Sequence, residues 1–428
     1  MPALFDIPER ASKSDDKALI QKSKKKSTSK ITSKGNYDIS MICATVEKYL
    51  GKYADEMETV QDGQVLSDYI DKAIDFGYIA IDTETTGLDP LKDDLVGIGL
   101  YLPNEKAIYI PVGHISHVTG ALVKNQLSTD VVGRILRRLE DAGTKNIFFN
   151  AVFDIRFIKK HCGVRLSCYW DCYLASRCLN ENEPNKGLKK LHQKYILKGE
   201  EDAFKFDELF KGKNFALIPL KTAYLYAAHD PKITWEYFDY QRQYLRLDHE
   251  RKDMRDIAWV FFNIEMPCID AVVDMEDTGI AFDMEYNEKL KEKYHAMLDE
   301  RVAEFNKACK AYSKEISEYT GKTVLEDPIN INSVPQLQAL LYDIIGLEGP
   351  IDKKTKQPSR STGEEVLKKL KHPIVDAILS YRELSTIVST FIDKLPECVN
   401  PNDGRIHCEF NQYGARTGRS EEHTSELQ

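Results

Sequence analysis

The spacing of apolar residues changes several times between residues 39 and 250. Short runs rich in β-branched and aromatic residues predict strands at 78–84, 95–102, 106–112 and 145–150. Apolar residues at helical spacing predict helices within 40–75, directly after 150, and near 170–180, 186–196, 219–229 and 231–244. Pro219 and Pro231 stand where the first turn of a helix accepts proline. Strands interleaved with helices predict an α/β domain, a mixed sheet with helices, over 39–250.

Beyond residue 250 the pattern becomes mostly helical. Apolar residues recur at helical spacing in 265–279, where Gly279 is typical of a helix end, and a long helix is expected to follow to about 313. The sequence therefore predicts a second, mostly α-helical region over 251–419. Residues 1–38 are polar and rich in lysine, which predicts a disordered basic arm. Such an arm either contacts DNA phosphates or serves only as a solubilising tail.

Composition narrows the class of protein. The chain has 428 residues, a net charge of −9 and nine scattered cysteines. Free thiols in a reducing compartment are expected, and Cys168 and Cys172 fit core packing better than any common zinc spacing. The negative charge excludes a uniformly positive surface, so any nucleic-acid surface must be local. Since no apolar run approaches the roughly 20 residues of a membrane span and no signal peptide is evident, we expect a cytoplasmic protein without a membrane partner.

Acidic residues gather in three of the predicted elements. Asp82 and Glu84 stand two apart on a strand, so their side chains leave the same face. Asp154 follows another strand, and Tyr226 and Asp230 stand four apart in a helical run, on one helix face. Converging carboxylates repel each other, and divalent cations are the usual reason to hold them together. Because all the ligands are oxygens, Mg²⁺ or Mn²⁺ is favoured over zinc, and the pattern indicates a two-metal nuclease.

Each of these residues has a simpler explanation when it is taken alone. A single Asp or Glu is usually a solvated surface charge, and a lone tyrosine such as Tyr226 is usually a core aromatic with a wet hydroxyl. Asp82, however, directly follows the apolar run at 78–81, where an unpaired charge is costly. Three acidic segments in this order favour a catalytic site over the separate explanations.

The three segments resemble the DEDDy family of proofreading 3′–5′ exonucleases. Asp-Thr-Glu-Thr-Thr-Gly-Leu-Asp at 82–89 is similar to the family's first motif, 150–154 to its second and 226–230 to its third. The resemblance implies a ribonuclease H-like fold in which four carboxylates hold two metal ions: Asp82, Glu84, Asp154 and Asp230. It also implies that Tyr226 orients the attacking water, since a tyrosine with a pKa near roughly 10 is a poor base at neutral pH. Leu88 matches the family's wedge against the terminal base, and Asn150 a polar residue beside the cleaved end.

The second region resembles the thumb of family A DNA polymerases, such as DNA polymerase I. The similar segments follow the family's order: 275–280, 331–337, 361–367, 372–375 with 381–384, and 404–407. In that family the thumb grips the primer–template duplex, so the resemblance implies DNA contacts from Arg382, Arg405, His407 and Arg416. The predicted partners are single-stranded 3′ ends and primer–template DNA. Protein partners and oligomeric state cannot be predicted from this pattern.

The resemblance also implies what surrounds these domains. The family's palm and fingers would lie beyond 419, so we expect a fragment without polymerase activity. No 5′ nuclease domain precedes the exonuclease region, and this arrangement resembles the phage-type members of the family. We therefore expect the protein in the cytoplasm of a bacterium or a phage-infected host. Residues 420–428 depart from the family's pattern, and we expect a non-native tail that packs against nothing. Two other functions remain open: a ribonuclease D-like RNA 3′ exonuclease, and a non-catalytic DNA-binding clamp.

Overall fold

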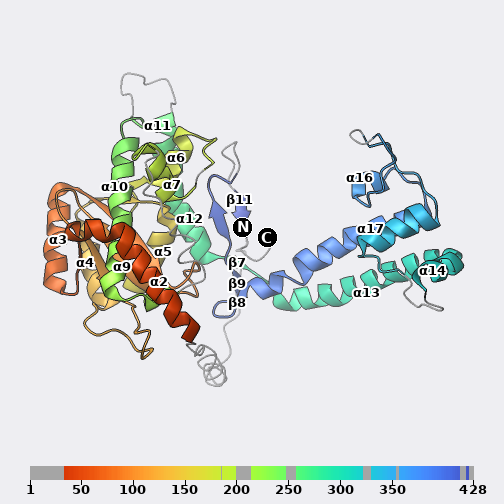
Figure 1. Cartoon of the computed structure of the whole chain (residues 1–428), viewed down its shortest axis with the longest axis horizontal. Coiled ribbons are helices and arrows are strands. Elements are labelled where there is room, and N and C mark those ends of the chain that lie inside the picture. The colour runs from red at the N-terminus through yellow and green to blue at the C-terminus, as the bar shows by residue number, and fades with distance from the viewer. Residues whose placement is uncertain are drawn as a thin grey trace, which may run out of the picture. The chain divides into compact units, whose positions relative to one another are not determined.

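The computed structural model describes residues 33–184, 186–198, 214–246, 257–321, 329–352, 356–414 and 421–423. The chain folds into two compact units, 1–273 and 274–428. Figure 1 shows the sheet and its helices in the first unit and the long helices of the second. Among the described residues, no helix has both the length and the apolar character needed to cross a membrane. All nine cysteines are free thiols, as predicted.

A six-stranded mixed sheet forms the centre of the first unit. Its strand order is β1-β4-β3-β2-β5-β6 within the described residues. The strands are β1 (Met57–Thr59), β2 (Tyr78–Thr85), β3 (Leu95–Tyr101), β4 (Ala107–Pro111), β5 (Lys145–Phe148) and β6 (Trp170–Asp171). β2, β3 and β4 pair antiparallel, and β5, on the other side of β2, is parallel to both β2 and β6. The four predicted strands are confirmed.

Several helices of the first unit pack against this sheet and bury its apolar side chains. In chain order they are α2 (Ser33–Leu50), α3 (Gly63–Phe76), α4 (Thr129–Asp141), α5 (Ala151–Cys162), α6 (Cys172–Leu179), α7 (Leu188–Tyr195), α9 (Leu220–Ala227), α10 (His229–Gln241), α11 (Ile257–Val260) and α12 (Met266–Thr278), the last of which crosses into the second unit. α10 packs along β2, β3 and β5, and α5 contacts the same strands. The predicted α/β architecture is therefore confirmed.

The first unit extends past the predicted domain boundary at residue 250. Phe261 and Phe262 follow α11, and their ring centroids lie 4.7 Å and 5.7 Å from that of Trp170. Trp170 is almost fully buried and lies on β6. The start of the helical region therefore completes the core of the α/β unit rather than beginning a separate one.

The second unit is mostly helical, as predicted. It contains α13 (Met284–Cys309), α14 (Ser313–Thr320), α15 (Val334–Gln338), α16 (Glu364–Leu367) and α17 (Pro373–Ile387), with π-helical stretches at Ala339–Ile344 and Val388–Ile392. α13 and α17 lie side by side (Figure 1), and Asn287 near the start of α13 donates to the carbonyl of Ile392, so the two helices run antiparallel. Short strands complete the unit: β7 (Ile280–Ala281), β8 (Val399–Asn400), β9 (Arg405–Ile406), β10 (Glu409–Asn411) and β11 (Glu421–His423).

Two expectations about the ends of the chain need correction. Residues 33–38, predicted to belong to the disordered arm, form the first turns of α2. The later turns of α2 are held by the buried residues Ile42, Val46 and Leu50, and an existing helix extends more easily than a new one nucleates. Residues 421–423, predicted to pack against nothing, pair antiparallel with β10. Strand pairing uses the main chain and needs no particular side chains. The rest of both segments, 1–32, 420 and 424–428, lies outside the described residues.

Candidate active site

The acidic cluster forms where β2 meets the helices α9 and α10. Asp82 and Glu84 lie on β2 and are half-buried, and Asp230 lies buried in the first turn of α10. One oxygen of each carboxylate lies within 4.8 Å of the others. Three carboxylates from two separate elements thus converge on one point, as the sequence predicts.

Two glycines on β3 make this convergence possible. In the antiparallel pairing of β2 and β3, Gly99 stands opposite Asp82 and Gly97 opposite Glu84. Opposed residues share a face of the sheet, so these glycines leave space on the face that carries the carboxylates. A Cβ atom on Gly99 would lie 2.2 Å from the carbonyl oxygen of Ala227. Glycine inside a strand is typical of such a close backbone approach, a signal that sequence reasoning missed here.

Asp154 is held beside the cluster by Thr83, the residue between Asp82 and Glu84. It lies on α5, and its Oδ1 accepts hydrogen bonds from the main-chain N–H of Thr83 at 2.9 Å and from the Thr83 hydroxyl at 2.6 Å. Asp154 is outside the tightest group of three. It is nevertheless close enough for its charge to raise the pKa of Asp82. The structure therefore brings all four predicted carboxylates to one region.

Burial and mutual repulsion disfavour the charged forms of these carboxylates. Burial raises the pKa values of Asp82 and Glu84 well above their ordinary values, and the neighbouring carboxylates raise them further. Burial also raises the pKa of Asp154 to about 8, although the two hydrogen bonds from Thr83 act to lower it. A divalent cation would offset this repulsion, and an all-oxygen donor set suits Mg²⁺ or Mn²⁺. The residues present therefore fit a metal site.

Tyr226 lies beside Asp230 across a short helix junction. α9 ends at Ala227 and α10 begins at His229, so the two residues belong to consecutive helices, which correspond to those predicted near 219–229 and 231–244. Ala228 keeps helical dihedral angles, which preserves the one-turn spacing. Burial raises the pKa of the Tyr226 hydroxyl, and the nearby charge of Lys189 only partly opposes this rise. The hydroxyl is therefore protonated at neutral pH.

Lys189 is a site residue that sequence reasoning missed. It lies in the first turn of α7, and its Nζ donates to the Tyr226 hydroxyl oxygen at 2.6 Å and to Asp230 Oδ2 at 2.9 Å. Burial acts to lower the pKa of Lys189, but the charge of Asp230 and the contact with Tyr226 raise it overall. In the sequence this lysine stands among others in 186–194, a pattern typical of a solvated helix face.

The two predicted substrate contacts of the first unit lie at the ends of the acidic elements. Leu88 follows β2 in a loop and is 78% exposed. Asn150 precedes α5 with a left-handed backbone (φ 72°), and its side chain is exposed. Their contacts with the terminal base and the cleaved end stay predictions.

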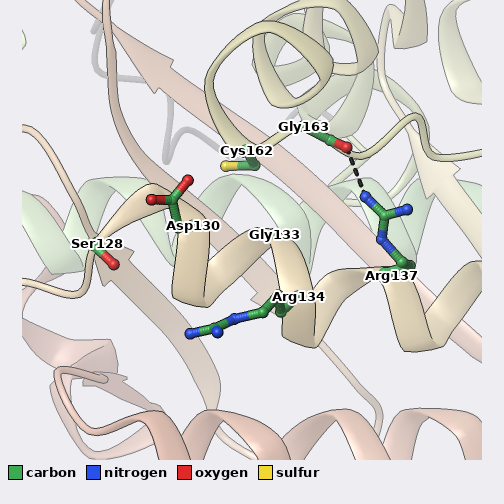
Figure 2. A pocket seen from close by; sticks show the side chains of 7 residues that line it. All are labelled: Ser128, Asp130, Gly133, Arg134, Arg137, Cys162 and Gly163. Atoms are coloured by element: carbon green, nitrogen blue, oxygen red, sulfur yellow. Dashed lines mark hydrogen bonds between the residues drawn. The ribbon is translucent and has the colours of Figure 1, made fainter.

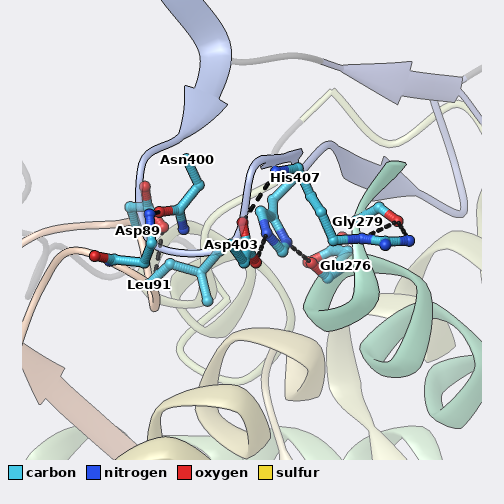
Figure 3. Close-up of polar contacts among 9 residues, drawn as sticks. Asp89, Leu91, Glu276, Gly279, Asn400, Asp403 and His407 are labelled. Atoms are coloured by element: carbon cyan, nitrogen blue, oxygen red, sulfur yellow. Dashed lines mark hydrogen bonds and ion pairs between the residues drawn. The ribbon is translucent and has the colours of Figure 1, made fainter. Parts of the chain in front are cut away.

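In the second unit, three of the four predicted DNA contacts use their donors within the protein. Arg382 donates to the carbonyl of Thr362. Arg405 donates to the carbonyl of Gly279 at 3.1 Å and 3.3 Å. His407 lies between the carbonyl of Glu276 (2.7 Å) and the carboxylate of Asp403 (2.9 Å), as Figure 3 shows. Arg416 lies outside the described residues. These DNA contacts stay predictions.

A separate cavity of about 570 Å³ lies between the start of α4 and the end of α5. Figure 2 shows Arg137 reaching across it to the carbonyl of Gly163, at 2.8 Å. Its other lining residues include Ser128, Asp130 and Arg134. None of the carboxylates of the acidic cluster lines it, so it is not part of the candidate active site.

Known protein families match both the exonuclease region and the helical region of the chain. Residues 57–245 match the 3′–5′ exonuclease family, and residues 295–428 match DNA polymerase family A. The chain is similar to DNA polymerase I of Chloroflexus aurantiacus, with 31% identity over 379 residues, 86% of this chain and 37% of that protein. It is also similar to DNA polymerase I of Synechocystis sp., with 33% identity over 377 residues, 86% of this chain and 35% of that protein.

Fold comparison gives the same result. The solved structure of the POL domain of Pol1 from M. smegmatis, in complex with DNA primer-template and dNTP, superposes with a TM-score of 0.59 at 20% identity. The match covers 85% of this chain and 54% of that one. The predicted ribonuclease H-like fold of the exonuclease region and the helical thumb-like region are thereby confirmed. The chain spans 37% and 35% of the two curated relatives.

Proposed function

Since this chain belongs to DNA polymerase family A and carries a 3′–5′ exonuclease domain, we propose that it removes nucleotides from the 3′ ends of DNA as the proofreading part of a DNA polymerase I-like protein. The observation that carries the proposal is the convergence of Asp82, Glu84 and Asp230, with Asp154 beside them, inside the exonuclease match at 57–245. A match to DNA polymerase family A follows at 295–428, which disfavours the ribonuclease D-like alternative. The complete set of carboxylates disfavours a non-catalytic clamp.

The proposal requires divalent cations. Asp82, Glu84 and Asp230 would hold one ion, and Asp154 would help to hold a second near Asp82. Two such ions would activate a water and steady the leaving 3′ oxygen of the phosphodiester. The oxygen-only donor set makes Mg²⁺ or Mn²⁺ the expected cation.

The protein's own side chains would orient the reactants. The Tyr226 hydroxyl is protonated, so it would donate a hydrogen bond that positions the attacking water rather than act as a base. Leu88 would wedge against the terminal base, because an exposed leucine next to the acidic strand offers an apolar surface for stacking. Asn150 would contact the cleaved end through its amide.

DNA is the proposed partner of the second unit as well. The comparison structure was solved with primer-template DNA, and we propose a similar duplex as ligand here. Arg382, Arg405, His407 and Arg416 are the proposed contacts. Arg382 and Arg405 would use their remaining guanidinium donors. His407 would have to give up its contact with Glu276 or Asp403, because both ring nitrogens are engaged. The cytoplasmic location stays a prediction.

Digestion of single-stranded DNA from its 3′ end tests the proposal directly. The purified chain should shorten a 5′-labelled DNA single strand with Mg²⁺ or Mn²⁺ and lose this activity in EDTA. Asp82→Ala and Asp230→Ala should nearly abolish turnover because each removes a metal ligand, whereas Tyr226→Phe should cost less because only water orientation suffers. An RNA strand of the same sequence is the control for substrate class. Unchanged activity in Asp82→Ala, or a preference for RNA, would contradict the proposal.

A further inference from the structure

Lys189 makes contacts that the carboxylates and Tyr226 alone do not explain. We propose that it is a positioning residue of the exonuclease site, which orients the Tyr226 hydroxyl and supplies a fixed positive charge that limits metal affinity at Asp230. This inference rests on the proposed function. It adds a residue from α7 to a site otherwise built from β2, α5, α9 and α10.

One ammonium group makes three contacts with two functional residues. Lys189 Nζ lies 2.6 Å from the Tyr226 hydroxyl oxygen, 2.9 Å from Asp230 Oδ2 and 3.9 Å from the centre of the Tyr226 ring. Its side chain is 21% exposed and that of Asp230 is 11% exposed. A contact so sheltered from solvent is screened far less than a surface ion pair.

The surrounding structure fixes where this lysine points. Leu188 and Leu191 are buried on either side of it in α7. One turn further along, His192 Nε2 lies 2.7 Å from a carboxylate oxygen of Glu236 on α10. α7 is therefore attached to the same helix that carries Asp230. The buried leucines and the His192 contact hold this face of α7 toward α10, so Lys189 points to the site and not to solvent.

Hydrogen-bond direction shows what Lys189 does to Tyr226. An ammonium group has three donors and no acceptor, so the phenol oxygen must accept from Lys189. The single phenol hydrogen is then left to point away from the lysine. Tyr226 thereby keeps its one donor for an acceptor other than the lysine, as the positioning of a water requires. Without Lys189 the hydroxyl could rotate or accept instead.

The charge of Lys189 acts on the metal site in the opposite direction from the carboxylates. Its ammonium stands on Asp230 Oδ2, and Asp230 is one of the three residues that could hold an ion. Like charges at this distance repel, so a cation binding to Asp230 must work against the lysine. Removing the charge should therefore tighten metal binding while turnover falls. A purely structural ion pair would give a less stable protein without tighter metal binding.

Lys189→Met tests this prediction in the full chain, since methionine has a similar length and no charge. Turnover on single-stranded DNA should fall by roughly tenfold to a hundredfold, as expected for a misplaced catalytic group. Mn²⁺ affinity, measured by electron paramagnetic resonance of free Mn²⁺, should rise on the order of tenfold. Lys190→Met is the matched control because Lys190 is the next residue of α7 and is exposed. It should change neither quantity.

A double-mutant cycle separates positioning from support of the fold. If Lys189 acts through the Tyr226 hydroxyl, Lys189→Met should slow turnover far less in a Tyr226→Phe background than in the wild type. Additive losses, or weaker or unchanged Mn²⁺ binding in Lys189→Met, would overturn the inference. If Lys189→Met fails to fold, Lys189→Gln, which keeps a donor but no charge, should still bind Mn²⁺ more tightly. An inactive Asp82→Ala together with a wild-type-like Lys189→Met would refute this inference alone, whereas an active Asp82→Ala would refute the proposed function.

Discussion

Gly99 offers a sharp test of how the fold sets the geometry of the acidic site. It faces Asp82 across the β2–β3 pair, and the backbone of Ala227 passes directly over it. Ala227 joins Tyr226 to α10, which carries Asp230. Gly99→Ala would place one methyl group between the strand and this junction. The substitution changes no residue proposed to contact metal or DNA.

The size of the disturbance follows from the distances. The new Cβ would lie 2.2 Å from the Ala227 carbonyl oxygen and 3.1 Å from the ring of Pro231, whereas ordinary contacts begin at 3.4 Å. The junction would therefore have to move by about 1 Å. Overpacking of this kind costs about 1–3 kcal/mol of stability, partly offset by about 0.4–1 kcal/mol from the lower entropy of the unfolded chain. A displacement of about 1 Å at catalytic groups can cost on the order of a hundredfold in turnover.

Gly99→Ala should thus keep most of its stability and lose most of its activity. Turnover on end-labelled single-stranded DNA and the thermal midpoint should be measured together. Gly51→Ala is the control, because a Cβ at Gly51 would have no neighbour within 4 Å. If Gly99→Ala digested DNA at the wild-type rate with an unchanged midpoint, the close approach of Ala227 would not set the position of Asp230 and Tyr226.

Three further predictions concern the support of the carboxylates. Thr83→Val removes the 2.6 Å hydroxyl bond to Asp154 but keeps the main-chain bond. The observed position of the Asp154 carboxylate should lose about 1.5–3 kcal/mol of stabilisation. DNA digestion should become slower as a result, and Thr83→Ser should restore its rate. In metal-free protein, the raised pKa of Asp154, about 8 against an ordinary 3.8, means that the folded state binds a proton that the unfolded chain releases. The stability that Asp154 contributes should therefore be fully present below about pH 4 and should fall as the pH rises through about 8. Calorimetry should find that Mn²⁺ and Asp154→Asn each reduce this dependence of unfolding free energy on pH. A dependence that neither change affects would exclude Asp154 as its source. Asp171→Asn should lower the thermal midpoint and activity together, because the new amide N–H₂ would face the main-chain N–H of Ala151, another donor. Asp62→Asn should be tolerated, because Asp62 caps its helix through only one oxygen. Equal effects of the two substitutions would contradict the role of Asp171.

The residues that carry a strong local pattern were predictable from the sequence. The four predicted strands and the helix that carries Asp154 are correct because their apolar runs are long enough to show a period. The acidic residues were predictable because their spacing along one strand and one helical run places them on a common face. β1 and β6 were not predicted. With three and two residues they show no period, and only their pairing with β4 and β5 defines them.

Residues whose role depends on a distant partner could not be predicted in this way. Lys189 belongs to a lysine-rich segment and becomes a site residue only because α7 packs against α10. The predicted boundary at residue 250 misses the packing of Phe261 and Phe262 on Trp170, which lies far away in sequence. Arg405 and His407 resemble free DNA contacts in sequence, and the fold instead gives several of their donors to main-chain carbonyls or Asp403. Local pattern carries no information about such partners.

Asp171 shows how much of the catalytic geometry is set outside the three acidic motifs. It is 2% exposed, and its carboxylate accepts main-chain N–H bonds from Asn150 and Ala151 at the start of α5 and from Tyr173 and Leu174 at the start of α6. Burial raises the pKa of this carboxyl, while the four N–H donors act to lower it. A single carboxylate therefore fixes the beginnings of two helices, one of which, α5, directly follows Asn150 and carries Asp154. Since Thr83 holds Asp154 from the strand side, the position of the fourth carboxylate is determined from both ends, before any ion binds.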